Sequence, residues 1–456
     1  MIFIKRTVII KDFQRFPIIF LKLFTNSTDR VHVRPPHFIW NRLTPGIRQH
    51  LIRRSIDLSR QSNRYIFKIA ETKEELEGAY RLLYDSYLRT GLMDPHPNQM
   101  RCNVYQSLPY TTTVICKEGN RIIGTIGIIK DSPIGFPSDK VFKEQNDFYR
   151  KKGFHLCELS ALAVSPGNRG NHEVSLSLMK FMYFYITRYM NCTMMCATIH
   201  PRAFDFYAGL FSFQRNGEIV KYDFANGALA THISGECAPI EGFMKFAYKD
   251  VEPEYNLYNF IFLHESPAMQ FPKRKHTCVL DPIMTPELLK YFFVEKTEVF
   301  KNCSPEELSL VASAWKLHFD IGTVPYLKDV DISRSFRYPT QVQAVLLHEH
   351  RAIFGVISDL SEGGFFFQTD ERLAPAPYHE IIFNFSHKTF RIPCTPRWHH
   401  EKDADRMAGG YGMEFLVTRI DLLQALREIM QVKGDERSED EATKPDENII
   451  PLKKAA

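Results

Sequence analysis

Residues 155–215 alternate short apolar runs with loops and a long helical segment. The run 155–164 has the length of a strand and is apolar except for Glu158, and a second such run covers 192–199. Between them, 173–190 carries few charges along its length, so it is predicted to be a helix packed on both sides. A strand that delivers one buried acid, followed by a loop and a helix N-terminus, is typical of a catalytic arrangement.

The pattern upstream of this core predicts a strand, a helix, a hairpin and another helix. Thr72 and Glu75 have the spacing of a capping box at the start of the first helix. The loop Asp131–Asp139 is rich in Pro and Gly and is expected to cover a substrate. Downstream, Asn226-Gly227 predicts a second hairpin turn. In chain order, the upstream elements are Tyr65–Ile69, Thr72–Thr90, 111–116, 121–130 and 141–152.

Composition changes along the chain predict five segments. Residues 1–64 form a basic arm with a short helix near 48–59, residues 65–250 an α+β domain, and residues 251–330 a helical bridge without chemical motifs. Short strands and turns over 331–432 predict a small β-barrel closed by a helix over 419–432. Residues 433–456 are charged and contain proline, which predicts disorder.

Charge and cysteine content narrow the class of protein. The 456 residues carry a formal charge of only +5, which does not suggest a nucleic-acid binder. Nine cysteines without regular spacing favour a reducing cytoplasm, and Cys192 and Cys196 are predicted to be core thiols, so no metal site is expected. Met1–Thr25 mixes cations with large apolar residues. It is expected either to lie on the anionic inner face of a membrane or to pack on the main domain.

The residues around Glu158 carry a resemblance to a known superfamily. Glu158-x-Ser160-x-Leu162-Ala-Val-x-Pro166-x-x-Arg169 resembles the central motif of the GNAT acyltransferases. The sequence is most similar to the bacterial N-acyl amino acid synthases, which are relatives of the acyl-homoserine-lactone synthases. Four further stretches fit that branch in order and extend the resemblance over roughly 65–250: Tyr80–Tyr87, Asp131–Asp139, Glu144–Arg150 and His200–Arg202 with Phe206-Tyr207.

The resemblance implies a GNAT-like fold, a mixed central sheet flanked by helices, and a site on its central strand. Joining an acyl chain to an amine requires removal of a proton, polarisation of the thioester carbonyl and exclusion of water. By resemblance Glu158 takes the amine proton, and Ser160, which shares its strand face, orients the amine or lines the cleft. Val164, Arg169 and Arg202 are implied to bind the donor.

The residues after Arg169 bear on the identity of the acyl donor. Relatives that use acetyl-CoA have glycines where this chain has His172 and Val174. Without them, backbone N–H groups crowd less easily around a pyrophosphate. This favours acyl carrier protein, which presents its acyl group on phosphopantetheine, and the basic residues Arg150–Lys152 and Arg202 are predicted to receive that acidic protein. Ala161 and Ala203 replace an Arg and a His of related motifs.

The barrel segment resembles a PilZ domain, a small β-barrel that binds cyclic di-GMP. The residues that carry the resemblance are Arg334, Arg337, Asp359, Ser361, Gly364 and the stretch 410–415. An arginine suits guanine because its fork donates to O6 and N7 together. The family spaces two arginines four residues apart. Here Arg337 takes the second place, Ser333 stands at the first, and Arg334 is one residue out of register.

These observations predict an N-acyltransferase that moves a long acyl chain from acyl carrier protein to an amino acid and is regulated by its PilZ domain. Two alternatives remain. One is an acetyl-CoA-dependent GNAT enzyme, and the other is a cyclic di-GMP effector that uses a degenerate acyltransferase fold as a scaffold. No tightly bound cofactor is expected.

Overall fold

A computed structural model describes most of the chain between Trp40 and Ile429. The described residues are 40, 42–56, 58, 64–132, 134–168, 172–273, 281, 283–316, 320–330, 337–348, 351–373, 378–386, 388–400, 409–429 and 449–451. Met1–Thr25, Arg169 and Arg334 lie outside them. Among the described residues, no helix combines the length and apolar character needed to cross a membrane. The chain divides into two compact units, which are described separately.

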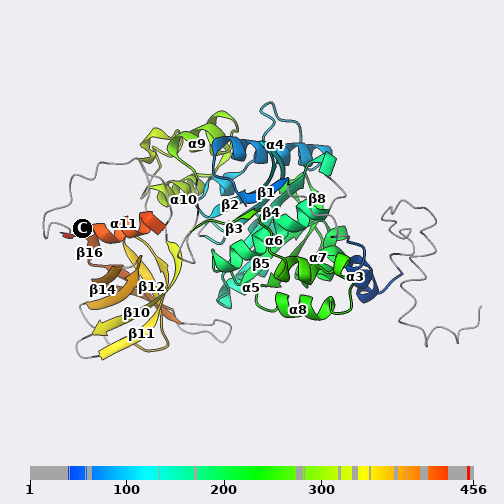
Figure 1. Ribbon diagram of the computed structural model, residues 1–456. Helices are drawn as coiled ribbons and strands as arrows, with labels where there is room; N and C mark the ends of the chain where they lie inside the picture. Colours follow the sequence, from blue (N-terminus) through cyan, green and yellow to red (C-terminus); the bar gives the residue numbers. More distant parts are fainter. Residues whose placement is uncertain are drawn as a thin grey trace, which may run out of the picture. The chain divides into compact units, whose positions relative to one another are not determined.

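The larger unit contains a mixed sheet in the order β6-β8-β5-β4-β3-β2-β1-β9, with β7 paired to β8 (Figure 1). Within the described residues, β4 runs parallel to β5 and β1 parallel to β9, and the other neighbours are antiparallel. The strands are β1 (Tyr65–Ile69), β2 (Thr111–Glu118), β3 (Arg121–Lys130), β4 (Leu156–Val164), β5 (Met194–Ile199), β6 (Gln214–Arg215), β7 (Val220–Tyr222), β8 (Ala228–Glu236) and β9 (Met269–Gln270). The predicted mixed central sheet is confirmed.

Helices cover both faces of the sheet, which explains why β3 is buried almost throughout. Two glycines allow the helices to approach closely. A Cβ on Gly78 of α4 (Lys73–Arg89) would lie 2.7 Å from Cγ1 of Ile122, and a Cβ on Gly124 would lie 2.8 Å from Cγ1 of Val174 in α6 (His172–Arg188). The third long helix of this domain is α5 (Asp139–Lys151).

The start of α4 differs in one detail from the predicted capping box. Thr72 caps the helix, because its side chain accepts a hydrogen bond from the backbone N–H of Glu75 at 3.2 Å. The Glu75 carboxylate does not return to Thr72. It accepts from the backbone N–H of Glu71 at 2.9 Å and from the ammonium groups of Lys68 and Lys117. The ion pairs with these lysines compete for the carboxylate, and the spacing alone did not reveal them.

The helical bridge is confirmed as a series of short helices, chiefly α9 (Pro286–Lys290) and α10 (Pro305–Trp315). Ser304 and Glu307 form the reciprocal capping box at the start of α10. At its end, the fully buried Trp315 donates from Nε1 to the carbonyl of Ser107 at 2.8 Å. This hydrogen bond ties the bridge to the segment that precedes β2.

The C-terminal strands form a closed antiparallel barrel in the order β10-β11-β12-β15-β14-β13 (Figure 1). Its inner positions are filled by aromatic and branched side chains such as Phe365, Phe367 and Ile357. Helix α11 (Ile420–Ile429) buries Leu422, Ala425 and Leu426. The strands are β10 (Tyr338–His348), β11 (Arg351–Leu360), β12 (Gly364–Gln368), β13 (His379–Phe385), β14 (Lys388–His400) and β15 (Gly410–Phe415).

The predicted disordered tail contains one paired segment. Ile449–Pro451 forms β17 and pairs with β16 (Val417–Arg419), so the prediction of disorder is wrong for these three residues. Two consecutive isoleucines favour a strand even in a charged segment. The rest of the tail lies outside the described residues.

The smaller unit comprises residues up to 61, 202–213 and 239–265. Its described helices are α3 (Pro45–Arg53), α7 (Phe204–Phe211) and α8 (Ile240–Ala247). Arg48 forms an ion pair with Asp205 at 2.7 Å, and Arg53 donates to the carbonyl of Gly209 at 3.0 Å. The helix predicted within the basic arm therefore packs on α7.

Candidate functional site

Glu158 lies in the middle of the sheet, on β4, with Ile129 opposite on β3 and Cys196 opposite on β5. Its side chain is only 2% exposed. One carboxylate oxygen, Oε2, accepts two hydrogen bonds from Ser138, from the hydroxyl at 2.6 Å and from the backbone N–H at 3.1 Å. Burial raises the pKa of Glu158 to about 7, although the bonds from Ser138 act in the opposite direction. Glu158 therefore exchanges a proton near neutral pH.

A chain of hydrogen bonds leads to Glu158 from the far side of Ser138. The Asn146 amide donates to the Ser138 hydroxyl at 2.8 Å and to Asp139 at 2.8 Å, which fixes the orientation of the amide. Its oxygen lies 2.9 Å from Nε2 of His232, and burial lowers the pKa of that imidazole to about 4. His232 is therefore neutral and donates from Nε2. The path of donors from His232 through Asn146 and Ser138 thus ends at the carboxylate of Glu158.

Arg150 fixes the loop that places Ser138 over Glu158. Its guanidinium binds Asp131 at 2.7 Å, Asp139 at 2.8 Å and Asp147 at 2.7 Å. Burial alone would lower the pKa of Arg150, but the hydrogen bonds that it donates to Asp131 and Asp139, together with the charges of these carboxylates, outweigh burial and raise the pKa. Asp139 in turn accepts from the backbone N–H of Phe136 at 2.9 Å. The prediction that Arg150 faces an acidic carrier protein is wrong, because its fork is occupied within the protein.

The strand pairing of the sheet changes at Glu158. Pairing between β4 and β5 ends at Glu158 and Cys196, although β5 continues to Ile199. Beyond Glu158, β4 pairs with β3, with a register shift opposite Thr125 and Gly127, and Ala161 has a positive φ of 57°. Such a bulge bends a strand and re-aims its groups, and bulges often lie next to active sites.

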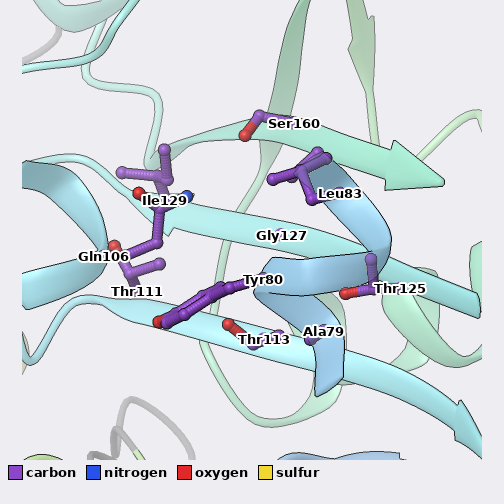
Figure 2. Close-up of a pocket in the computed structure, with 11 residues that line it drawn as sticks. Ala79, Tyr80, Leu83, Gln106, Thr111, Thr113, Thr125, Gly127, Ile129 and Ser160 are labelled. Atoms are coloured by element: carbon purple, nitrogen blue, oxygen red, sulfur yellow. The ribbon is translucent and has the colours of Figure 1, made fainter. Parts of the chain in front are cut away.

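A narrow cavity lies on the Glu158 face of the sheet, beneath α4 (Figure 2). Ser160 stands opposite Gly127, and both line this cavity together with Ala161. Its volume of about 10 Å³ is enough for about one water molecule. A second cavity of about 20 Å³ shares four lining residues with it and continues to apolar side chains of the bridge. The shared residues are Tyr80, Gln106, Thr111 and Thr113.

Arg101 is a cation in the segment that follows α4. Arg101 rests on the ring of Tyr87, 4.1 Å from its centroid, and donates to the carbonyl of Phe224 at 2.6 Å. The pKa of Tyr222 is raised chiefly by burial. The charge of Glu158 raises that pKa further, and the charge of Arg101 lowers it. Both charges therefore act on the one tyrosine hydroxyl.

The structure describes two of the three donor-binding residues predicted from sequence, and each is described by itself. Val164, at the end of β4, is half-buried opposite Gly124. Arg202 is exposed in a short turn, Pro201–Ala203. Arg169 lies outside the described residues. Among those that the structure describes, no group of three or more His, Cys, Asp or Glu side chains is arranged to hold a metal ion.

In the barrel, the predicted nucleotide-binding residues lie at one end of β11 and in the following turn. Arg337 pairs with Asp359 at 2.8 Å. Ser361 closes the turn, because its hydroxyl donates to the carbonyl of Gly364 at 3.0 Å and accepts from the N–H of Gly364 at 3.2 Å. A Cβ on Gly364 would lie 2.1 Å from the carbonyl oxygen of Met413, so only glycine fits there. Ser333 and Arg334 lie outside the described residues.

Sequence reasoning missed Ser138, Asn146 and His232 as residues around Glu158. Ser138 and His232 are separated from their partners by 20 and 86 residues, which no local motif reveals. A helical pattern in which the polar Asn146 lies on the buried face of α5 is a weak signal that points to a buried hydrogen-bond network.

We expect Ser138→Ala to raise the pH at which activity reaches half its maximum. A hydrogen bond to a charged group is worth roughly 1.5–3 kcal/mol, which corresponds to about 1–2 pKa units. Without the hydroxyl, the ionised form of Glu158 loses this bond, and the midpoint moves upward from about 7. Ser132→Ala is the control, because the Ser132 hydroxyl in the same loop has no hydrogen-bond partner among the described residues. Equal midpoints in both variants and the wild type would contradict this prediction.

Two family models identify the class of the chain as an N-acyltransferase that carries a C-terminal barrel domain. Residues 78–234 match the family model of the N-acyl amino acid synthase FeeM, and residues 331–431 match the model of the PilZ domain. The chain thus contains an N-acyl amino acid synthase domain of the FeeM family followed by a PilZ domain. No curated protein matches the sequence.

Several solved structures are similar to the synthase domain. FeeM, an N-acyl amino acid synthase from uncultured soil microbes, is 22% identical, with 39% of this chain and 94% of FeeM covered and a TM-score of 0.35. BjaI, a CoA-dependent acyl-homoserine lactone synthase, is 12% identical, with 47% and 96% covered and a TM-score of 0.35. The acyl-homoserine lactone synthase LasI is 17% identical, with 38% and 90% covered and a TM-score of 0.31.

Proposed function

We propose that the protein transfers a long acyl chain from acyl carrier protein to the amine of an amino acid, with Glu158 as general base. The observation that carries the proposal is the buried Glu158 carboxylate, which has a pKa of about 7 and lies where β4 and β5 part. A general base is most effective when its pKa is near the working pH. An ordinary structural glutamate in the same place would be expected to have a cationic partner, and here Ser138 supplies both hydrogen bonds.

The proposed step forms one bond and breaks one bond. Glu158 takes a proton from the ammonium of the amino acid, directly or through a water. The freed amine attacks the thioester carbonyl, the C–N bond forms, and the tetrahedral intermediate collapses with loss of the phosphopantetheine thiolate. As the C–S bond breaks, the nitrogen gives its second proton to the leaving thiolate, and Glu158 later releases its proton to water. The products are an N-acyl amino acid and the free carrier thiol. Ser160, next to the bulge at Ala161, is proposed to orient the amine or line the cleft.

The place where β4 leaves β5 is proposed to receive the phosphopantetheine arm. From Leu159 to Ala163 β4 is no longer paired with β5, so the backbone edge that faced β5 is proposed to bind an extended, amide-bearing chain. Val164 marks the far end of this stretch. Val174, where a CoA-binding relative has glycine, is fully buried and fills the space above Gly124. This supports a donor without an adenosine pyrophosphate, and the exposed Lys151 and Lys152 are proposed to meet its acidic carrier. Arg169 and Arg202 each stay predicted donor-binding residues.

The acyl tail and the amino acid are proposed to occupy different regions. The two narrow cavities beneath α4 join into a tunnel for the tail if Tyr80 moves, because Tyr80 lines both. For the amino acid, Glu158 is proposed to receive the amine, and Arg101, which is held against the ring of Tyr87 and the carbonyl of Phe224, is proposed to bind the carboxylate. An acceptor of this chemistry is an α-amino acid rather than a simple amine.

The PilZ domain is proposed to regulate this activity by binding cyclic di-GMP. Arg337 presents its fork beside Asp359, and the Ser361–Gly364 turn fixes the loop that follows. Arg334 and these residues constitute the proposed site. The protein is further proposed to act in the cytoplasm, at or near the inner face of the membrane where Met1–Thr25 would bind.

The donor can be tested with purified full-length protein and two forms of the same acyl group. We expect product with acyl carrier protein at a rate at least about tenfold higher than with acyl-CoA, which is a difference of about 1.4 kcal/mol in transition-state stabilisation. Release of free thiol, followed together with the N-acyl product by mass spectrometry, gives both rates. A preference for acyl-CoA would contradict the donor assignment and leave the transfer step intact.

A further inference from the structure

Four residues line up across the outer face of the barrel, next to the Arg337–Asp359 pair. Asp359 on β11 stands opposite Phe366 on β12, Phe366 opposite Gly412 on β15, and Gly412 opposite Trp398 on β14. Cross-strand partners share a face of a sheet, and the residues that flank Phe366 point into the barrel and are fully buried. The row therefore lies on the outside.

Phe366 and Trp398 form one aromatic surface in this row. Their rings are stacked, with centroids 5.1 Å apart and planes 20° from parallel. A Cβ on Gly412 would lie 2.1 Å from the indole of Trp398, so the missing side chain is what allows the ring to lie across β15. A bulge in β14 between Pro396 and Trp398 directs the indole to this position. Trp398 is nevertheless 49% exposed.

The aromatic surface is continuous with the charged pair. The backbone N–H of Phe366 donates to the carboxylate of Asp359, which also accepts from Arg337 at 2.8 Å. Guanine offers acceptors at O6 and N7 for an arginine fork and N–H donors at N1 and N2, directly beside O6, for a carboxylate. Its flat face stacks on aromatic rings. The row thus brings together charged groups that can bind the edge of a guanine and aromatic rings that can stack on its face.

We propose that Trp398, backed by Phe366, is a stacking platform for a guanine of cyclic di-GMP whose edge is bound by Arg337 and Asp359. The proposal rests on the proposed nucleotide binding by the PilZ domain and adds a binding residue outside its sequence motif. It also explains how a chain with Ser333 in place of the first arginine holds the ligand. Stacking on Trp398 supplies part of the binding that the missing arginine contact would give.

The test measures cyclic di-GMP binding to the full-length protein by calorimetry and by tryptophan fluorescence. Trp398→Ala is expected to weaken binding by roughly 5- to 100-fold, as for loss of one base–aromatic stack, and Trp398→Phe by less. Phe354→Ala is the matched control, because Phe354 is an aromatic of the same barrel that is 72% exposed and away from the row. It is expected to bind as the wild type does.

The fluorescence measurement separates stacking from a general loss of structure. Of the three tryptophans, Trp315 is fully buried in the bridge and Trp398 is exposed on the barrel. We expect cyclic di-GMP to quench the wild-type emission and the quenching to be lost in Trp398→Phe, which still folds and binds. Tight binding by Trp398→Ala with unchanged quenching in Trp398→Phe would overturn the platform. Absence of binding by the wild type would instead overturn the nucleotide-binding role on which it rests.

Discussion

Glu158→Gln is expected to lower the rate of acyl transfer by a factor of about 100 or more, as for loss of a general base. Glutamine has the size of glutamate and can still accept from Ser138, so the loop and sheet around it keep their structure. What it cannot do is take a proton from the ammonium of the acceptor. The measurement is kcat for amide formation at saturating donor and acceptor, between pH 6 and 9.

The pH dependence of the wild type adds a second readout. Since the pKa of Glu158 is about 7, the rate is expected to rise with pH through that value as the base becomes deprotonated. The stability of the fold is expected to change with pH in the opposite direction to the rate. The pKa of Glu158 in the folded protein lies above its usual value of 4.5. The contribution of Glu158 to the stability of the fold is therefore fully present below pH 4.5 and is lost as the pH rises through 7. Because glutamine does not ionise, Glu158→Gln does not lose stability in this way. The variant is expected to be more stable than the wild type at pH 8.

Glu75→Gln serves as the matched control for a buried glutamate. Glu75 is 6% exposed, but its carboxylate is held by Lys68 and Lys117 rather than by a serine. Its replacement is expected to reduce stability and to leave kcat nearly unchanged. If Glu158→Gln kept near wild-type kcat, Glu158 would be a structural residue. If both variants lost activity equally, the loss would reflect damage to the fold.

Arg150→Met is expected to give the largest loss of stability in the synthase domain. Removing the guanidinium leaves Asp131, Asp139 and Asp147 close together without their common partner. Truncating one partner of a buried charge pair typically costs 3–5 kcal/mol, and partial exposure of these side chains reduces the expected loss to about 3 kcal/mol. Urea unfolding of the variant and the wild type at pH 7 measures this difference.

Two further variants serve as comparisons for Arg150→Met. The first separates geometry from charge at Arg150, and the second is a control at an exposed ion pair. Arg150→Lys keeps the charge but offers no fork, so it should recover only part of the stability. Arg351→Met removes an exposed ion pair with Glu371 and should change stability by less than about 1 kcal/mol. A loss for Arg150→Met no larger than that for Arg351→Met would contradict the role of Arg150 in fixing the loop.

The sequence was sufficient for the order of elements because hydrophobic period and turn residues act locally. The strand Tyr65–Ile69, the capped helices at Thr72 and Ser304 and the hairpin with Asn226-Gly227 all lie where these local signals predict them. The closed barrel was likewise indicated by short strands and turns. Errors arose where pairing is decided by distant chain segments, as at Glu75 and Ile449–Pro451.

The surroundings of the candidate site were less accessible to prediction. Glu158 was visible as the lone acid of an apolar strand, but the support from Ser138 and Asn146 depends on how the loop 131–139 folds back over β4. Arg150 was misassigned because a basic residue in a row of three looks solvent-exposed in sequence. Its three carboxylate partners are brought together only by the fold.

The most direct test of acyl transfer compares lipid extracts of a host that overproduces the full-length protein with extracts of a host that overproduces Glu158→Gln. Mass spectrometry of both extracts detects the product whichever amino acid and acyl length it contains. We predict N-acyl amino acids in the first extract at amounts about 100-fold or more above those in the second. Extracts without any such difference, from hosts that contain equal amounts of the two folded proteins, would contradict the account and favour a non-catalytic scaffold.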